Sequence, residues 1–353
     1  MLTKHPWRTT KLALCQRLGL RTCHRRARHP MGCCRNAIQI KTGSEQDKAL
    51  MDSRHHWAVF LAGGDGTRLR SLTLRIAGDL RPKQFCRVFG EQSLRGETRA
   101  RVKPLFDNDR EIIMVSQCHE QFYREELVHT GGSRVIAQPL NRGTAIAMAM
   151  ALLETSRADR DAVVAFFPCD HFYSNSHAFR LALERGLDSV ERYPESVVLL
   201  GAESRYPEVE YGWIEPESDL PSDSDAAVRV KCFWEKPSLN QARTLLDRRC
   251  LWNEFVCIGR ASAFLDLLRT RIPGIVRSLK RGFATDDWET AYGAIPAVDF
   301  SREILTPESH RLLVVRDRDS GWTDLGTPER VVEALTQNRV RPAWFAGAVE
   351  CAS

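Results

Sequence analysis

The sequence of 353 residues lacks the features that would assign it to several common classes of protein. No apolar run approaches the ~20 residues that a membrane span needs, so we expect no contact with a membrane. No string matches the P-loop pattern G-x-x-x-x-G-K-[ST]. The dinucleotide pattern G-x-G-x-x-G would start at Gly64, but Leu69 stands where its third glycine belongs. These absences exclude two well-known phosphate-binding loops.

Acidic side chains are missing from residues 1–44, which contain ten lysines and arginines. The formal net charge of the whole chain is +6, so the remaining residues carry about −4. We interpret residues 1–52 as a disordered basic leader, with a targeting segment or a translation start further along the chain as alternatives. The mildly acidic remainder argues against a nucleic-acid partner, because such partners are bound by broad basic faces.

The eleven cysteines lack any spacing typical of a zinc site or a disulfide framework. Their number is odd, and several of them lie inside apolar runs. This distribution favours reduced thiols and predicts a cytoplasmic protein.

Short apolar strands alternate with amphipathic helices from Trp57 onward. The pattern predicts strands at 57–62, 111–116, 134–138, 161–167, 197–202 and 312–315, and helices at 93–102, 119–128, 144–155, 177–190, 261–279 and 328–336. It is typical of an α/β, Rossmann-like domain with a mostly parallel mixed sheet covered by helices on both faces. We place this domain at 53–340 and a C-terminal tail at 341–353. Ligands of such sheets gather at the carboxyl ends of the strands.

The segment 57–85 has the composition of a phosphate site. An apolar strand runs into Gly63-Gly64-Asp65-Gly66, where missing side chains let backbone N–H groups approach a ligand. Arg68 follows at once, and Lys83 adds positive charge further on. The alternative is a glycine-rich turn surrounded by solvated charges.

The strings GGDGTRLR and RPKQF resemble the signature of the sugar-1-phosphate nucleotidyltransferases, in particular the mannose-1-phosphate guanylyltransferases. Further strings resemble that family in the same order, over about residues 55–335: QPLNRGTAIA, PCDH, YGWI, EKP, WN and GWTDLG. The resemblance implies a GT-A-type fold with a β-hairpin insertion that binds the sugar. It also implies transfer of a nucleotidyl group from GTP to mannose 1-phosphate, which gives GDP-mannose and pyrophosphate. A homodimer is compatible with this assignment.

The resemblance also implies roles for individual residues, with Mg²⁺ as the cofactor. The residues implied in catalysis are Arg68, Lys83, Asp170 and Asp324, and the two aspartates are the implied metal ligands. Those implied in nucleotide binding are Ala62, Gly63, Gly64, Gly66, Thr67, Gln138, Asn141, Gly143 and Thr144. Those implied in binding the sugar phosphate are Tyr211, Gly212, Glu235, Lys236 and Asn253.

Simpler structural interpretations stay open for several of these residues. Asn141 and Thr144 could cap the helix that begins there, and Asp170 and Asp324 could close turns. Glu235 and Lys236 point to opposite faces if their segment stays extended, so a bend at Pro237 is needed for both to reach one ligand.

The string WN continues with Glu254-Phe255 where the family usually has Ser-Gly, and this departure leaves the sugar undetermined. Another sugar 1-phosphate, another nucleotide, or a non-catalytic regulatory protein are the functional alternatives.

Overall fold

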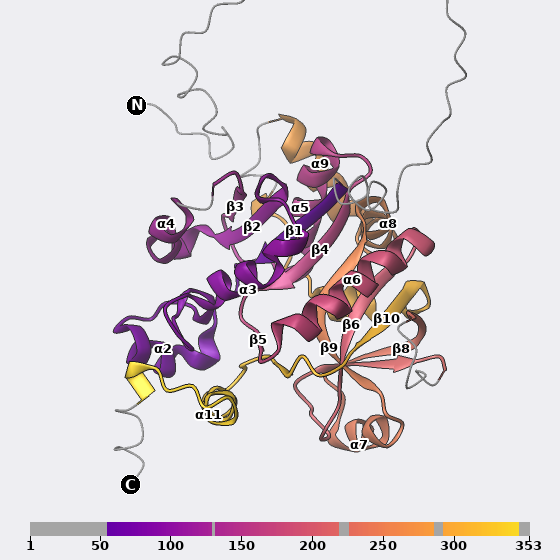
Figure 1. Cartoon of the computed structure of the whole chain (residues 1–353). Coiled ribbons are helices and arrows are strands. Elements are labelled where there is room, and N and C mark those ends of the chain that lie inside the picture. Colours follow the sequence, from indigo (N-terminus) through magenta and orange to yellow (C-terminus); the bar gives the residue numbers. More distant parts are fainter. Residues whose placement is uncertain (1–54, 129–130, 219–225, 286–291, 346–353) are drawn as a thin grey trace, which may run out of the picture. The chain divides into compact units, whose positions relative to one another are not determined.

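A computed structural model describes residues 55–128, 131–218, 226–285 and 292–345 (Figure 1). Contacts between residues separate Met1–Met51 from Asp52–Ser353, and all described residues belong to the second unit. The predicted leader lies outside the described residues, as does the predicted tail from residue 346 onward.

A nine-stranded mixed sheet forms the centre of the described unit, in the order β3-β2-β1-β4-β9-β6-β10-β8-β7. Its strands are β1 (His56–Leu61), β2 (Glu111–Ser116), β3 (Arg134–Gln138), β4 (Val163–Pro168), β6 (Val197–Glu203), β7 (Gly212–Pro216), β8 (Val228–Glu235), β9 (Leu251–Arg260) and β10 (Leu312–Asp317). The strands β1 to β4 pair in parallel with one another, and β6 pairs in parallel with β10. Strand β9 runs antiparallel between β4 and β6.

Strand β9 was not among the predicted strands, although it lies in the middle of the sheet. Helix α2 (Arg70–Ala77) was likewise not among the predicted helices. Strands β7 and β8 pair antiparallel, and they extend the main sheet through pairing of β8 with β10 and of β7 with β9.

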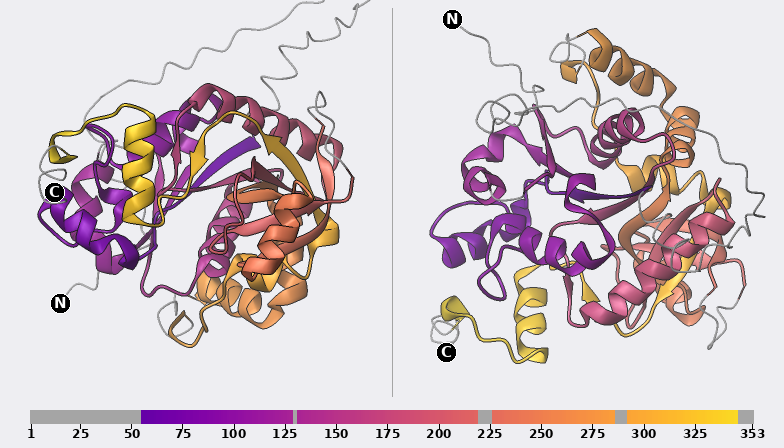
Figure 2. Two further views of the ribbon diagram at one scale, coloured as in Figure 1. Left: turned by 90° about the horizontal axis from the view of Figure 1, so that it is seen from below. Right: turned by 45° about the horizontal axis from the view of Figure 1, so that its top comes forward.

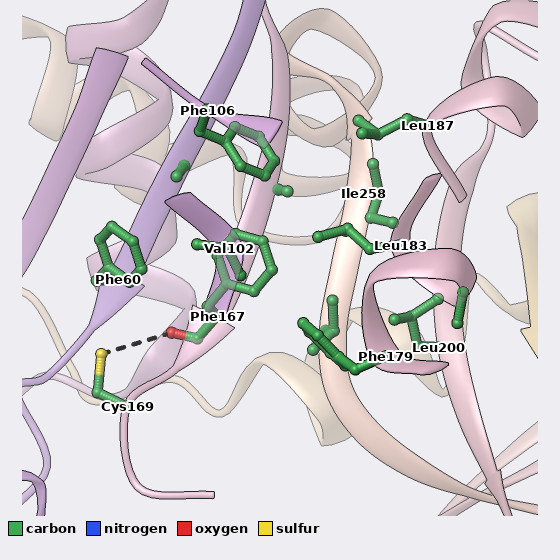
Figure 3. Packing of buried hydrophobic residues seen from close by; sticks show 14 of the residues in the cluster. Phe60, Val102, Phe106, Phe167, Cys169, Phe179, Leu183, Leu187, Leu200 and Ile258 are labelled. Atoms are coloured by element: carbon green, nitrogen blue, oxygen red, sulfur yellow. Dashed lines mark hydrogen bonds between the residues drawn. The ribbon is translucent and has the colours of Figure 1, made fainter. Parts of the chain in front are cut away.

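Helices cover both faces of the sheet (Figure 1). One face carries α3 (Leu94–Val102), α4 (Glu120–Val128) and α6 (Ser176–Arg192). The other carries α5 (Thr144–Ala158), α8 (Ala261–Arg271) and α9 (Pro273–Thr285), so the predicted helix at 261–279 is divided before Pro273. Figure 3 shows part of the core on the α6 side, where Phe179 and Leu183 face Phe167 and Ile258. This burial of large apolar side chains holds the strand ends in fixed positions.

The last part of the described chain returns to its first part. A two-stranded antiparallel sheet joins β5 (Phe172–Tyr173) to β11 (Trp322–Thr323). Helix α11 (Pro328–Gln337) then packs against α2, through a cluster that includes Leu69 and Leu335 (Figure 2). A further helix, α7 (Leu239–Asp247), follows β8. None of the helices within the described residues is long and apolar enough to cross a membrane.

Candidate functional site

A cavity of about 450 Å³ lies at the carboxyl ends of β1, β3 and β4. Its lining includes most of the residues implied by the sequence motifs: Gly63, Gly64, Gly66, Gln138, Asn141, Gly143, Thr144, Asp170, Tyr211, Gly212, Glu235, Lys236, Asn253 and Asp324. Four of the implied residues, Ala62, Thr67, Arg68 and Lys83, are not part of this lining. A volume of this size is typical of small-molecule sites.

The side chain of Gln84 stabilises the glycine turn after β1. The Gln84 side-chain amide donates hydrogen bonds to the carbonyl oxygens of Ala62 and Gly64, at 2.9 and 2.7 Å. Gly66 has a left-handed backbone with a φ of 57°, and a Cβ there would lie 3.1 Å from the main-chain nitrogen of Lys83. The turn therefore needs glycine at this position for both its backbone conformation and its close packing.

The loop between β3 and α5 contacts this turn. The Asn141 side-chain amide donates to Asp65 at 3.0 Å, and its oxygen accepts the Gly143 N–H at 3.1 Å. A Cβ on Gly63 would lie 2.9 Å from the Gln138 side-chain nitrogen. The Thr144 hydroxyl accepts the Phe300 N–H at 2.9 Å. Asn141 and Thr144 thus have structural bonds of their own, and both still line the cavity.

Lys83 is buried behind the cavity and connects its two aspartates. The Lys83 ammonium group lies 3.3 Å from the Asp170 carboxylate and donates to the main-chain oxygens of Asp324 and Leu325, at 2.8 and 3.1 Å. One cation therefore contacts two residues that are far apart in the sequence. We had expected Lys83 at the phosphates, and in this structure its contacts are to protein groups.

The Asp324 carboxylate is held by several donors that converge on its Oδ1 atom. These are the Tyr211 hydroxyl at 3.0 Å, the Gly326 N–H at 2.9 Å and the Arg330 guanidinium at 2.8 Å. Burial would raise the pKa of Asp324, but the positive charges of Arg330 and Lys83 and the hydrogen bond from the Gly326 N–H hold it below its usual value. Asp324 is therefore ionised at neutral pH, and Arg330 links it to Glu208 and to helix α11.

His171 lies beside the Asp170 carboxylate, and its tautomer is set by a hydrogen bond. Burial lowers its pKa, so its ring is neutral. The Trp322 indole donates to Nδ1 at 3.1 Å, which leaves the proton on Nε2, 3.8 Å from the Asp170 carboxylate. The β5–β11 pairing supports this contact, since Trp322 belongs to β11 and His171 directly precedes β5.

Two aspartates that line one cavity suit a divalent cation with oxygen ligands. Carboxylates bind Mg²⁺, which keeps waters and phosphate oxygens as its other ligands. A second group of potential metal ligands lies nearby, where ligand atoms of Asp65, Cys118 and His119 come within 4.8 Å of one another. Asp65 already contacts Asn141 and His119, at 3.0 and 3.4 Å.

The other end of the cavity is formed by β7, β8 and β9. A Cβ on Gly212 would lie 3.1 Å from the Glu235 carboxylate and 3.3 Å from the Asn253 Cβ, so glycine brings these side chains close to the backbone of β7. Burial and the charge of Asp299 raise the pKa of Glu235 to about 7. Lys236 has a φ of 48°, so the chain turns at Lys236 itself, one residue before the predicted bend.

Glu210 connects the two ends of the cavity. Its Oε2 atom lies 3.4 Å from the Arg68 guanidinium and 3.7 Å from the Lys236 ammonium group. A carboxylate thus occupies the space between the two cations that the motifs assign to phosphates. All three side chains are roughly half exposed, which makes these ion pairs weak.

Several residues of this region were given no role in the sequence analysis, among them Gln84, Glu210 and Phe255. Gln84 lies inside the string RPKQF, so its position in that motif was a usable signal. Glu210 directly precedes Tyr211, and only the folded arrangement brings it to Arg68. Phe255 lines the cavity although it stands where the resembling family usually has glycine.

Comparison with known proteins agrees with this geometry. The sequence pattern of a family described as Nucleotidyl transferase matches residues 57–339. The alginate biosynthesis protein AlgA of Pseudomonas fluorescens is 30% identical over 280 residues, which are 76% of this chain and 56% of that protein. A mannose-1-phosphate guanylyltransferase of Klebsiella pneumoniae is 27% identical over 280 residues, 76% of this chain and 58% of that protein. The chain thus spans about half the length of the curated relatives it matches.

Comparison with solved structures finds a protein with a similar fold. A protein from Thermus thermophilus, described as a mannose-1-phosphate geranyltransferase, superposes with a TM-score of 0.68 at 26% identity. The match covers 82% of this chain and 80% of the Thermus chain. The described unit therefore has an α/β fold shared with this protein.

Proposed function

The chain belongs to the nucleotidyl transferase family, and we propose that it transfers the GMP group of GTP to mannose 1-phosphate. In this reaction a phosphate oxygen of the sugar phosphate attacks the α-phosphorus of GTP. The bond from that phosphorus to the bridging oxygen breaks, and pyrophosphate leaves with the bonding electron pair. The products are GDP-mannose and pyrophosphate. The observation that carries the proposal is one cavity lined by the glycine turn, two aspartates and the Gly212–Glu235–Asn253 cluster.

The protein's contribution in this proposal is positioning and charge neutralisation. The glycine turn would receive the triphosphate on its backbone N–H groups. Gln138, Asn141 and Gly143 would contact the base, and the Gly212 backbone, Glu235 and Asn253 would hold the sugar hydroxyls. Arg68 and Lys236 would receive phosphate charge. No cysteine is given a role, because direct displacement needs no covalent intermediate on the protein.

Asp170 and Asp324 would hold Mg²⁺ in this proposal. When bound, the cation would neutralise charge on the transferring phosphoryl group. Lys83 neutralises Asp170 and contacts the Asp324 backbone, so it would keep the two loops together before the cation arrives. Tyr211 and Arg330 would orient the Asp324 carboxylate through its Oδ1 atom.

A pyrophosphate-release assay tests the proposal directly. GTP and mannose 1-phosphate should release pyrophosphate only when Mg²⁺ is present, and GDP-mannose should accumulate in equal amount. A panel of sugar 1-phosphates and nucleoside triphosphates separates this activity from the same chemistry on other substrates. If GTP and GDP-mannose bind but no pair of substrates reacts, the chain is a sugar-nucleotide-binding regulatory protein.

A further inference from the structure

Phe255 has a backbone conformation that L-amino acids rarely adopt. Its φ is 60°, in the left-handed region. This conformation is unfavourable for a residue with a Cβ, because the Cβ approaches the following carbonyl oxygen. Such a residue persists only where its surroundings impose the conformation, and these cases cluster at functional sites.

Contacts on both faces of β9 hold Phe255 in its left-handed backbone conformation. The pairing of β9 with β6 shifts register here: Asn253 is opposite Gly201, and Cys257 is opposite Leu199. The residues between them bulge. On the cavity side, the Asn253 side-chain oxygen accepts the Phe255 N–H at 3.1 Å. In the core, the side chain of Glu254 is fully buried and contacts Asp317 at the end of β10.

This bulge directs the Phe255 side chain to the end of the cavity formed by β7, β8 and β9, which the proposed function assigns to the sugar. It lines the cavity together with Asn253, Asp299 and Ser301. Its ring is packed edge-on against the fully buried ring of Phe300, with centroids 6.3 Å apart. Because Phe300 is embedded in the core, the Phe255 ring has a rigid support on one side and the cavity on the other.

We propose that Phe255 is a specificity-determining residue, whose ring forms a wall of the sugar subsite and restricts it to hexose 1-phosphates without a bulky substituent. The inference rests on the proposed function. An aromatic ring offers the sugar an apolar surface and no hydrogen-bonding group. In this proposal the ring fills the space that an acylamino group of the sugar would need. Hexose 1-phosphates fit this subsite, and N-acetylhexosamine 1-phosphates are excluded from it.

The test compares Phe255→Gly with Phe255→Tyr and Arg249→Gly. Glycine tolerates the left-handed backbone, so Phe255→Gly should fold. Phe255→Tyr keeps the ring and should keep the wild-type preference. Arg249 is exposed and also left-handed, with a φ of 55°, so Arg249→Gly shows the effect of backbone relief outside the cavity.

We expect Phe255→Gly to lower kcat/KM for mannose 1-phosphate roughly tenfold. The preference for mannose 1-phosphate over N-acetylglucosamine 1-phosphate should narrow by at least about tenfold, while KM for GTP changes less than about twofold. Arg249→Gly should leave all three quantities unchanged. An unchanged preference in Phe255→Gly, or an equal change for GTP, overturns the assignment.

Calorimetric titration with GDP-mannose and with GDP provides a measurement that needs no turnover. The affinity difference between these ligands reports the sugar contacts, and it should shrink in Phe255→Gly only. If the wild type releases no pyrophosphate and binds neither ligand, the proposed function is wrong and the inference falls with it. If the wild type is active and Phe255→Gly keeps both the preference and the affinity difference, only the inference is wrong.

Discussion

Glu254, which directly precedes Phe255, forms a buried acid pair with Asp317. Glu254 is 0% exposed and Asp317 is 3% exposed. Within the described residues, none of their four carboxyl oxygens has a hydrogen-bond partner of good geometry. A proton retained by one of them supplies the missing donor. Burial, followed by the neighbouring Asp317 charge, raises the pKa of Glu254 well above its usual value. The folded chain therefore holds a proton here that the unfolded chain releases.

This pair makes stability depend on pH in a defined direction. Below about pH 4.5, Glu254 is protonated in both states and its contribution to stability is fully present. As pH rises above that value toward the raised folded pKa, the unfolded state ionises first, and stability falls by up to about 1.36 kcal/mol per pH unit. Glu254→Gln keeps a donor for Asp317 and does not ionise. We therefore expect this variant to lose that component of the pH dependence.

Urea unfolding of wild type and Glu254→Gln between pH 5 and pH 8 measures the effect. The difference in unfolding free energy should grow with pH in favour of the variant. If the unfolding free energies of wild type and variant changed with pH in the same way, the bound proton could not be assigned to this pair.

Glu210 pairs with Arg68 and Lys236, the two cations that we propose to receive phosphate charge, so it would compete with the phosphorylated substrates. Each exposed ion pair is worth about 0–1 kcal/mol. Glu210→Gln should therefore lower KM for the phosphorylated substrates about twofold to fivefold and leave kcat nearly unchanged. The effect should diminish at high salt, because salt screens exposed charges.

Asp266→Asn is the matched control for Glu210→Gln, since it removes a similarly exposed carboxylate that pairs with Arg269 at 2.7 Å on α8. Steady-state kinetics at low and high salt distinguish the two variants. A higher KM in Glu210→Gln would indicate that Glu210 itself helps to bind a substrate or a cation.

At the scale of elements, the sequence predicts strands that are buried and paired with near neighbours. β2 and β3 have the predicted bounds because each is a short run bounded by turn residues. β9 was missed because its residues, LWNEFVCIGR, mix apolar and polar side chains around a bulge. Its place between β4 and β6 is set by pairing with strands far away in the sequence, which local periodicity does not report.

The same distinction holds for the site. The glycine turn and Asp170 follow the neighbouring parallel strands β1 and β4, so their convergence on one edge of the sheet was predictable, whereas Asp324 follows β11 of the small sheet and was indicated only by its motif. The ring of Phe255, the bridge made by Glu210 and the burial of Lys83 depend on a bulge, a positive φ and contacts between distant segments. No pattern along the chain encodes these features.

Residues 298–300 form a strap that packs against Gly143 and Thr144 at the start of α5. Gly143 has a φ of 79°, and a Cβ there would lie 2.4 Å from the Val298 carbonyl oxygen. Gly143→Ala should therefore destabilise the protein by about 1–3 kcal/mol and weaken nucleotide binding, because the strap must move. Gly274→Ala in α9 is the control, since nothing lies within 4 Å of its Cβ position and alanine favours helices.

Thermal unfolding of the two glycine variants provides the measurement. Gly274→Ala should match the wild type or exceed it slightly. Equal Tm values for Gly143→Ala and wild type would mean that the strap moves at little cost.

At the scale of the whole molecule, the chain brings its first and last described segments together at the two aspartates. Lys83 holds the Asp170 loop against the backbone of Asp324, and Arg330 of α11 binds the Asp324 carboxylate. Helix α11 in turn packs on α2, which follows the glycine turn. A ligand that binds across this junction should therefore stabilise the entire described unit.

We expect Mg²⁺ together with GTP to raise the Tm more than either alone, because two nearby carboxylates and a triphosphate need a shared cation. A ligand at a hundredfold excess over its Kd adds about 2.7 kcal/mol to the free energy of unfolding, which amounts to several degrees in Tm. Asp170→Asn and Asp324→Asn should keep the fold, lose most turnover and lose the Mg²⁺-dependent part of this gain. Asp266→Asn should retain it. Differential scanning calorimetry with GTP, with and without Mg²⁺, makes the comparison. A full Mg²⁺-dependent gain in either site variant would exclude that aspartate as a metal ligand, since its carboxylate would then make no contribution to binding the cation.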